Sequence, residues 1–356
     1  MDRNPLTKRR RRFKQLIAMA RVLLKQVAAR AGVHLSTVSL ALRDDPRLPE
    51  ATRKKIQSLA AEMGYIPDAA MRALCAYRSS IRPKEVQSGL AYLIDHAPRP
   101  DSLAAIVYQG AKAQAARLGY NLITFNLAEK GATIERFQSI WRNSGLRGVL
   151  IGPFRNVGTV LGGDWSQWIT VVYGYSVEAP LFHRAVFDHF QNMLVHLQVL
   201  RSKGYKRIGL SLAQRTSDST HGMLQGAYLL DQARHGPKKP IPILTQRTRD
   251  EDELERWVQK ERLDALISYV EEYSLLVERG WKIPEQLGFS LLSTWAQDQR
   301  GKSAAFAGFD TKAEILAANA VSFLVSLIHE QAYGIPDTPR STMVTGAFRE
   351  GKTVRT

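Results

Sequence analysis

The chain has 356 residues and a formal charge of +17, with 44% hydrophobic residues and one cysteine. This length predicts two or three domains with a sizeable buried core, which excludes a wholly disordered chain. A single cysteine excludes an intrachain disulfide and a cysteine-based zinc site. No stretch has the roughly 18–20 uninterrupted apolar residues that a membrane span requires. We therefore expect a cytoplasmic protein that has no membrane partner.

The positive charge is concentrated near the N-terminus. Residues 1–90 contain 19 Lys or Arg against 7 Asp or Glu, whereas the remaining 266 residues contain 31 against 26. A basic head on a nearly neutral body predicts that the head meets a polyanion. Nucleic acid is the commonest such partner, and an anionic membrane surface is the alternative.

Residues 1–21 form a basic N-terminal arm, which we expect to be disordered. The run Arg9–Arg12 followed by Leu16–Ala20 is similar to a twin-arginine export signal, but Arg21 interrupts the apolar stretch. We favour a solvated arm that adds non-specific attraction to phosphates. A true start at Met19, just before the first predicted helix, stays open as an alternative.

Residues 22–67 show the pattern of three short helices. The first ends at Gly32, which permits a sharp turn, and the second covers about 35–42. The third begins near Pro49 and ends at Gly64. Two short helices joined by a tight glycine turn are typical of the helix-turn-helix that reads DNA. The apolar residues expected to face inward are Val27, Ala28, Ala31, Val38, Ala41, Leu42, Ile56, Leu59, Ala60 and Met63.

Beyond a polar linker, residues 88–356 alternate short apolar runs with helical segments. The predicted strands are Leu90–Ile94, Asn121–Phe125, Gly148–Ile151, Ile169–Tyr173, Ala185–Phe187, Arg207–Leu212, Ala265–Ser268 and Leu287–Leu292. The predicted helices are Leu103–Leu118, Ile134–Asn143, His189–Lys203, Thr220–Ala233, Glu251–Lys260, Tyr273–Arg279 and Lys312–His329. This alternation predicts an α/β body of two lobes, each a parallel sheet covered by helices on both faces, with a cleft between them.

Several runs of the sequence resemble the lactose-repressor/galactose-repressor (LacI/GalR) family. In the head they are Lys25–Val33, Ser36–Ser39, Glu50–Arg53 and Gly64–Ala70. In the body they are Gly110–Ala111, Arg117–Tyr120, Gly145–Ile151, Leu200–Gly209, Gly280–Glu285 and Gly351–Arg355. The resemblance covers about residues 22–356, densely in the head and patchily in the body.

The resemblance implies that the second helix of the head enters the major groove of DNA. The candidate major-groove residues are His34, Leu35, Ser36, Thr37, Ser39 and Leu40. His34 stands where a serine usually caps this helix, so the cap should be weaker or of a different kind. Leu40 stands where many members have an arginine. Because leucine offers only apolar contact, for instance to a thymine methyl, we expect a different operator preference.

The resemblance also implies a hinge helix within residues 68–87. In the family this helix orders on DNA, pairs across a dimer and inserts a leucine into the minor groove. Leu74 stands at that position, and Arg72 can reach phosphates. The alternative is that Leu74 merely packs the hinge onto the core. The implied assembly is a homodimer on a palindromic operator of double-stranded DNA.

For the body, the resemblance implies a fold similar to the periplasmic sugar-binding proteins, in which the chain crosses between lobes about three times. We place the first lobe at 88–188 and 304–330, and the second at 189–303 and 331–356. Ligands in such folds lie at the carboxyl ends of strands. The candidate effector-binding residues are Asp95, Tyr173, Arg215, His221, Glu271, Ser293 and Trp295. Each of them is equally consistent with a structural role.

Two features of the predicted effector site depart from the family. Ser293 and Thr294 replace the paired acids expected there, and His221 stands where an arginine is common. A bound carboxylate or phosphate would therefore lose a partner unless Arg215 substitutes.

The sequence shows no catalytic motif, no phosphate-binding glycine loop with a lysine and no pair of metal-binding histidines at helical spacing. We therefore predict a regulator without cofactor or metal, rather than an enzyme or an exported binding protein. The predicted function is a transcriptional repressor controlled allosterically by a small effector, a sugar in the first instance. The alternatives are a nucleobase or sugar-phosphate effector, or an activator.

Overall fold

The computed structural model describes residues 22, 24–42, 48–65, 88–100, 102–246, 250–294 and 305–356. The chain divides into two compact units, Met1–Arg82 and Pro83–Thr356. The predicted arm 1–21, the hinge candidates Arg72 and Leu74, and the effector candidate Trp295 lie outside the described residues.

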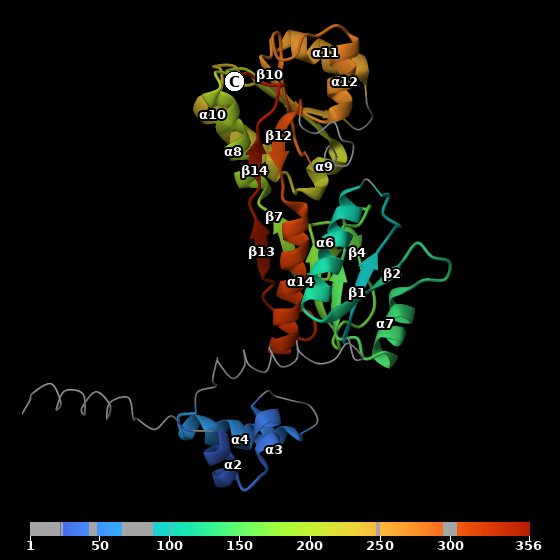
Figure 1. The fold of residues 1–356 in the computed structure, drawn as a ribbon, viewed down its shortest axis with the longest axis vertical. Coiled ribbons are helices and arrows are strands. Elements are labelled where there is room, and N and C mark those ends of the chain that lie inside the picture. Colours follow the sequence, from blue (N-terminus) through green and yellow to red (C-terminus); the bar gives the residue numbers. More distant parts are fainter. Residues whose placement is uncertain are drawn as a thin grey trace, which may run out of the picture. The chain divides into compact units, whose positions relative to one another are not determined.

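The first unit contains the three predicted helices of the head, which are α2 (Leu24–Ala31), α3 (Leu35–Ala41) and α4 (Glu50–Glu62) (Figure 1). Gly32 makes the turn between α2 and α3 with a φ of +66°, which is the left-handed region that glycine enters at little cost. The buried core of the head consists of Val27, Ala28, Val38, Ala41, Ile56 and Ala60. Ala31, Leu42 and Met63 are half-buried against this core. Leu59, also predicted to face inward, is half-buried outside this core. The sequence pattern thus correctly predicts the helices and most of their inner faces.

The first lobe of the second unit is built on a six-stranded sheet with the order β13-β7-β5-β3-β1-β2. Every pairing in it is parallel. Its strands are β1 (Ser88–Ile94), β2 (Tyr120–Asn126), β3 (Gly148–Ile151), β5 (Ile169–Tyr173), β7 (His183–Phe187) and β13 (Ser341–Val344). Helices α6 (Leu103–Arg117) and α14 (Ala313–Glu330) pack on one face, and α7 (Ile134–Asn143) packs on the other. A short pair, β4 (Thr159–Val160) and β6 (Val177–Ala179), lies beside this sheet.

The second lobe is built on a six-stranded sheet with the order β14-β12-β11-β10-β8-β9. All its pairings are parallel except that of β12 with β14. Its strands are β8 (Ile208–Ala213), β9 (Leu244–Gln246), β10 (Ala265–Ser268), β11 (Gly288–Leu291), β12 (Ala307–Asp310) and β14 (Ala347–Arg349). Helices α8 (His189–Ser202) and α10 (Met223–His235) cover one face, while α11 (Glu251–Lys260) and α12 (Val270–Glu278) cover the other. Two parallel sheets covered on both faces are the predicted architecture.

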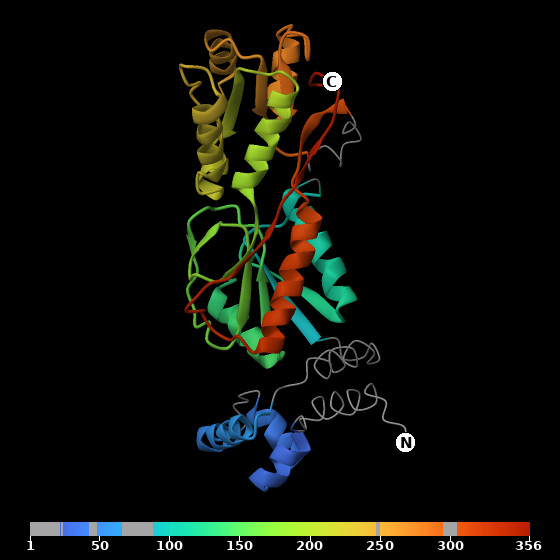
Figure 2. The same cartoon turned by 90° about the vertical axis from the view of Figure 1, so that its left-hand side faces the viewer.

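The chain crosses between the lobes three times, between β7 and α8, between β12 and α14, and between β13 and β14. Figure 2 shows the last segment running from the first lobe to the second. The predicted lobe boundaries are wrong in this part of the chain. Residues 307–310 join the second sheet instead of the first, and residues 341–344 join the first instead of the second. Both strands have only four residues, so their sheet is decided by distant pairing partners that local pattern does not reveal.

Two helix starts differ from the prediction by three residues. Helix α10 begins at Met223 instead of Thr220, because Gly222 takes a φ of +67° after the short helix α9 (Gln214–Ser219). Helix α12 begins at Val270, three residues earlier than predicted. The Glu272 carboxylate accepts a 3.0 Å hydrogen bond from the backbone N–H of Tyr269, which caps the helix there.

Helix α14 is long and apolar enough to cross a membrane by length and composition. It packs against α6 and the first sheet, however, and eight of its residues are buried in that core. We therefore assign its apolar character to core packing.

Candidate DNA-reading helix and effector cavity

The outer face of α3 leaves several of the predicted DNA-contacting residues accessible. His34 and Ser36 are exposed, and Leu35 is 44% exposed although it is a large apolar residue. Thr37 and Leu40 are half-buried. The side chain of Ser39 lies outside what the structure describes. On α4, the Gln57 amide donates a 2.9 Å hydrogen bond to the Ala41 carbonyl and so ties the end of α3 to the next helix.

His34 is the N-cap of α3, in an extended conformation. Its ring nitrogen Nδ1 accepts a hydrogen bond from the Ser36 N–H at 3.4 Å, and the Ser36 hydroxyl lies 2.8 Å from the same nitrogen. A distance of 3.4 Å is long for this type of bond, so the cap is weak. The expectation of a weaker cap than serine agrees with this geometry.

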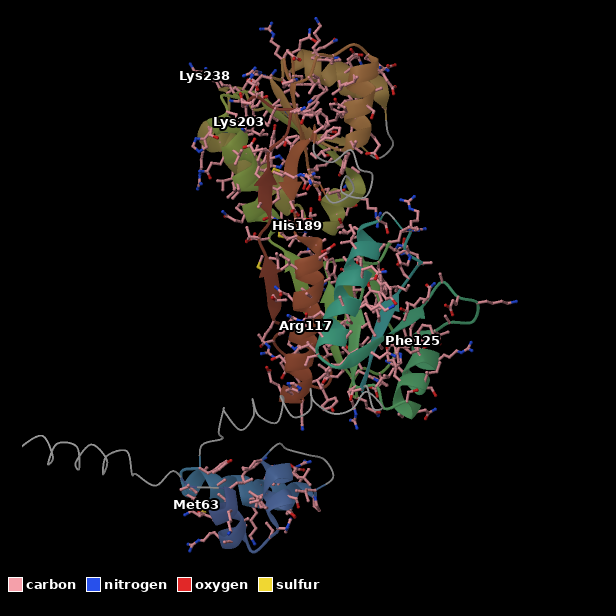
Figure 3. The ribbon with its side chains drawn as sticks, in the orientation of Figure 1. Met63, Arg117, Phe125, His189, Lys203 and Lys238 are labelled. Carbon is pink, nitrogen blue, oxygen red and sulfur yellow. The ribbon has the colours of Figure 1, made fainter. Side chains whose placement is uncertain are left out.

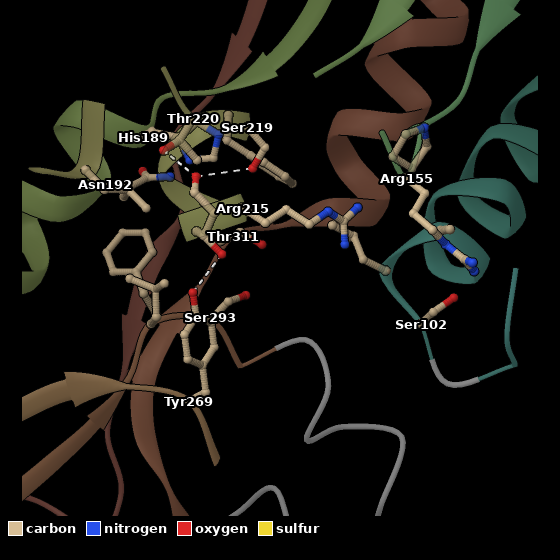
Figure 4. A pocket seen from close by; sticks show the side chains of 18 of the residues that line it. Ser102, Arg155, His189, Asn192, Arg215, Ser219, Thr220, Tyr269, Ser293 and Thr311 are labelled. Atoms are coloured by element: carbon tan, nitrogen blue, oxygen red, sulfur yellow. Dashed lines mark hydrogen bonds between the residues drawn. The ribbon is translucent and has the colours of Figure 1, made fainter. Parts of the chain in front are cut away.

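A cavity of about 690 Å³ lies between the two lobes of the body (Figure 4). From the first lobe it is lined by His96, Arg99, Ser102, Leu103, Ala104, Pro153, Phe154, Arg155 and Phe187. From the second lobe and the segment after β12 it is lined by His189, Asn192, Met193, His196, Arg215, Thr216, Ser219, Thr220, Leu224, Tyr269, Leu292, Ser293, Phe309 and Thr311. This size lies within the range of small-molecule sites.

The cavity forms where the carboxyl ends of strands from both sheets face one another. His96 follows β1, Phe154 follows β3, Tyr269 follows β10 and Ser293 follows β11. Parallel strands in one sheet end at the same edge, so residues far apart in sequence meet there. Figure 3 shows His189, the first residue of α8, where the two lobes meet.

Two of the predicted effector residues, Arg215 and Ser293, line the cavity. Asp95 does not line it, but its carboxylate accepts hydrogen bonds from the backbone N–H groups of Arg155 (2.7 Å) and Asn156 (3.4 Å). The other Asp95 oxygen lies 2.5 Å from Nδ1 of His96. Asp95 therefore positions the loop that carries Arg155.

The other described candidates are also absent from the cavity lining. Tyr173 is buried in the core of the first lobe, where burial raises the pKa of its hydroxyl well above the usual value. His221 packs its ring on Tyr175 with centroids 4.7 Å apart. Glu271 is exposed in the first turn of α12. The structure places none of these three in the cavity lining, because a place near a strand end does not determine where the side chain points.

Several lining residues were missed by sequence reasoning, among them Arg99, Arg155, His189, Asn192 and Thr311. Each lies within five residues of the carboxyl end of a predicted or observed strand. Sequence reasoning would find these residues by taking as candidates the whole loop or the first helical turn that follows each strand.

Burial keeps two histidines of the cavity neutral. It lowers the pKa of His189 to about 4 and the pKa of His196 to about 3. The His196 Nε2 lies 2.6 Å from the Ser290 hydroxyl. A neutral imidazole can donate one hydrogen bond and accept another, which suits a ligand that carries hydroxyl groups.

Three polar atoms of the cavity residues are buried without a hydrogen-bond partner among the described residues. They are Nδ2 of Asn192, Oγ of Ser293 and Oγ1 of Thr311. Buried polar groups are nearly always hydrogen-bonded in folded proteins. A polar ligand in the cavity would supply the missing partners.

Aromatic rings form much of the apolar wall. Phe154, Phe187 and Phe309 line it, together with Tyr269. The Tyr269 hydroxyl donates a 2.7 Å hydrogen bond to Oγ1 of Thr216, which fixes the orientation of this ring. Flat rings can contact the C–H faces of a sugar, while the polar groups bind its hydroxyls. In the described parts of the chain, no group of three His, Cys, Asp or Glu residues stands close enough to hold a metal ion.

Comparison with known proteins bears on both units. The family model for bacterial regulatory proteins of the lacI family matches residues 23–68. The sucrose operon repressor of Vibrio alginolyticus is 31% identical over 84 residues, which cover 24% of this chain and 89% of that protein. The HTH-type transcriptional repressor CytR of Escherichia coli (strain K12) is 24% identical over 212 residues, which cover 57% of each protein.

Solved structures show the same fold. The lac repressor dimer bound to operator and the anti-inducer ONPF has a TM-score of 0.55 and 16% identity, covering 94% of this chain and 99% of that one. The transcriptional regulator CelR in complex with cellobiose has a TM-score of 0.54 and 15% identity. The match covers 94% of this chain and 100% of that one. A LacI family regulator from Enterococcus faecium with bound ribose has a TM-score of 0.54 and 12% identity, covering 75% and 99%.

Both of these relatives are transcriptional repressors and not enzymes. The sucrose operon repressor, which has the higher identity, is matched over 89% of its length. The match of the helix-turn-helix head to the family model falls on α2, α3 and α4. The chain therefore belongs to the lacI family of bacterial regulatory proteins.

Proposed function

We propose that this protein is a cytoplasmic repressor that binds a palindromic DNA operator as a homodimer. Binding of a small carbohydrate effector to the body lowers or raises its affinity for the operator. The observation that carries the proposal is the presence in one chain of a helix-turn-helix head and of a cavity lined from both lobes. The head alone would support DNA binding only, and the cavity alone would support ligand binding only. Together in one chain they support a regulator that a ligand controls.

On the DNA side, α3 is the recognition helix. Leu35, Ser36 and Leu40 read base edges, while Thr37 and Ser39 contact phosphate or sugar and His34 lies at the start of the helix. One head with three short helices reads one half-site, so a palindrome requires two heads related by two-fold symmetry. Arg72 and Leu74 act in the minor groove between the half-sites. The operator-bound dimer among the similar structures supports this arrangement.

On the effector side, the cavity lies against all three crossings between the lobes. His189 directly follows the first crossing, and Thr311 lies in the second. Asn192 contacts the third through a hydrogen bond to Gly346. A ligand bound here favours one angle between the lobes, and reciprocal coupling then changes the affinity for DNA. The cellobiose and ribose complexes among the similar structures support a carbohydrate ligand.

The test is to incubate the purified full chain with sheared genomic DNA at near-physiological salt and to sequence what it retains. We expect a short palindrome that disappears or strengthens when a pool of sugars and sugar derivatives is added. A Leu35→Ala, Ser36→Ala double variant, changed only on the exposed face of α3, should fold normally and lose the palindrome. Uniform recovery of DNA by the wild-type protein, with and without the pool, would contradict the proposal.

A further inference from the structure

Three arginines line the same cavity, and none of their guanidinium groups makes a hydrogen bond or ion pair with another described residue. Arg99 and Arg155 belong to the first lobe, and Arg215 belongs to α9 of the second. Figure 4 shows the Arg215 side chain extending from its own lobe toward Arg155 and Ser102 of the other. Positive charge therefore faces the cavity from both sides.

No Asp or Glu is among the described residues that line the cavity. Three described acids that are near the lining in sequence have partners other than these guanidinium groups. The Asp95 carboxylate is held by backbone N–H groups and His96, and Asp188 accepts the Gln191 N–H at 3.0 Å at the start of α8. Asp310 pairs with Lys312 at 2.6 Å. Among the described residues, the three guanidinium groups therefore have no carboxylate partner.

The neutral part of the lining has a different chemistry. The Asn192 side chain belongs to a residue that is only 5% exposed, and its Nδ2 has no partner within the described chain. The hydroxyl oxygens of Ser293 and Thr311 are also buried without a partner within the described chain. These are hydrogen-bonding groups suited to hydroxyls, so the cavity combines a cationic part with a part that binds neutral polar groups.

We propose that the effector is an anion of sugar size, a polyhydroxylated compound with a phosphate or carboxylate group. Arg99, Arg155 and Arg215 bind the anionic group, and Asn192, Ser293 and Thr311 bind hydroxyls. This inference rests on the proposed function in that it names the ligand class of the same cavity. Guanidinium groups bind carboxylate and phosphate through paired charge-assisted hydrogen bonds, which are the strong ones.

The choice of an anion over a neutral sugar follows from charge. Three like charges around one cavity repel one another, and a neutral ligand would leave that repulsion in place. An anion offsets it and can also bridge the two lobes, because Arg215 belongs to the second lobe and Arg99 and Arg155 to the first. The same ligand would therefore both satisfy the site and favour closure of the lobes.

The first experiment follows the unfolding temperature of the full chain during titration with inorganic phosphate, with sodium chloride at matched ionic strength as the reference. The variants are Arg155→Gln, Arg215→Gln and the triple replacement that includes Arg99→Gln. Arg256→Gln, an exposed arginine of α11 away from the cavity, is the matched control. We expect saturable stabilisation of the wild type and the control. Each single variant should bind phosphate roughly 10-fold more weakly, and the triple variant should lose the effect.

The second experiment compares glucose, glucose 6-phosphate and glucuronate by calorimetry on the same proteins. Preference for either anionic compound over glucose supports the proposal, and the order of the two distinguishes a phosphate ligand from a carboxylate ligand. The proposal is overturned if phosphate stabilises the wild type and the triple variant alike, or if glucose binds as well as its anionic derivatives.

Failure of this inference and failure of the proposed function give different results. A protein that retains a palindrome but shows no arginine-dependent anion binding remains a regulator with another class of effector. A protein that binds anions through these arginines but retains no specific DNA has the ligand site without the regulatory role.

Discussion

Asn192 accepts a 2.9 Å hydrogen bond on its Oδ1 from the backbone N–H of Gly346, although 154 positions separate the two residues in sequence. Gly346 lies where the chain passes from β13 in the first sheet to β14 in the second. Asn192 also lines the cavity, and the other end of its amide, Nδ2, is buried without a partner among the described residues. One side chain thus links the ligand site to a crossing between the lobes.

Asn192→Ala should lower the free energy of unfolding by about 1–3 kcal/mol, because it leaves the half-buried Gly346 N–H without its acceptor. Urea unfolding of the full chain, followed by a signal from the body, measures this. Gln191→Ala is the matched control, since Gln191 is the exposed neighbour on the same helix and should change stability by less than about 0.5 kcal/mol. Equal effects of the two variants would show that the hydrogen bond to Gly346 contributes nothing to stability.

Stability should fall as the solution becomes more acidic than about pH 6.5. Burial lowers the pKa of His196 to about 3 and that of His189 to about 4, from an ordinary value of 6.5. Below pH 6.5 the unfolded chain therefore binds protons that the folded chain does not, which favours unfolding. Each histidine adds a slope of up to about 1.4 kcal/mol per pH unit until the folded form protonates as well.

The His196→Gln variant isolates one of these contributions, because glutamine can still donate to the Ser290 hydroxyl but does not titrate. Urea unfolding at several pH values should show a slope between about pH 5.5 and 4.5 that is shallower than in the wild type by about 1.4 kcal/mol per unit. Between pH 7 and 8 the two proteins should have the same slope. Parallel curves through the acidic range would contradict burial as the source of the pH dependence.

Much of the fold could be predicted because local signals and tertiary structure agree. Helix α7 has the predicted bounds, since Thr133 caps its start and its apolar residues recur on one face. Strand β3 is four buried residues in an apolar run and also has its predicted bounds. In contrast, the predicted boundaries place β12 and β13 in the wrong lobes, because the sequence of a four-residue strand does not show which strand it pairs with.

The candidate site was predicted less well, for a physical reason that Tyr173 illustrates. The strand-end rule gives the edge of the sheet where ligands bind, and two residues that it selects, Arg215 and Ser293, line the cavity. Side chains alternate between the two faces of a strand, however, and Tyr173, the last residue of β5, points into the core beside Phe187. Arg155 was missed because its position depends on Asp95, which is 60 residues away and holds its loop.

Leu40→Arg should change which operator the protein prefers. An arginine on the recognition helix can donate two hydrogen bonds to a guanine in the major groove, which leucine cannot do. We expect about 1–3 kcal/mol of new discrimination in favour of guanine at one position of each half-site, measured by selection from a randomised palindrome. Lys55→Gln is the comparison, because loss of an exposed charge on α4 should weaken binding similarly on all sequences. An unchanged preference in the arginine variant would place Leu40 away from the bases.

His34→Ser should strengthen the start of α3. The His34 ring accepts from the Ser36 N–H at the long distance of 3.4 Å, whereas serine is among the preferred N-cap residues. A gain of up to about 1 kcal/mol would slow amide hydrogen exchange in α3 about five-fold in the full chain, with α4 as the internal reference. His34→Ala, which has no capping atom, should speed exchange instead. If serine and alanine had the same effect, the cap would not set the stability of this helix, and the exposed His34 ring would be free to serve DNA contact alone.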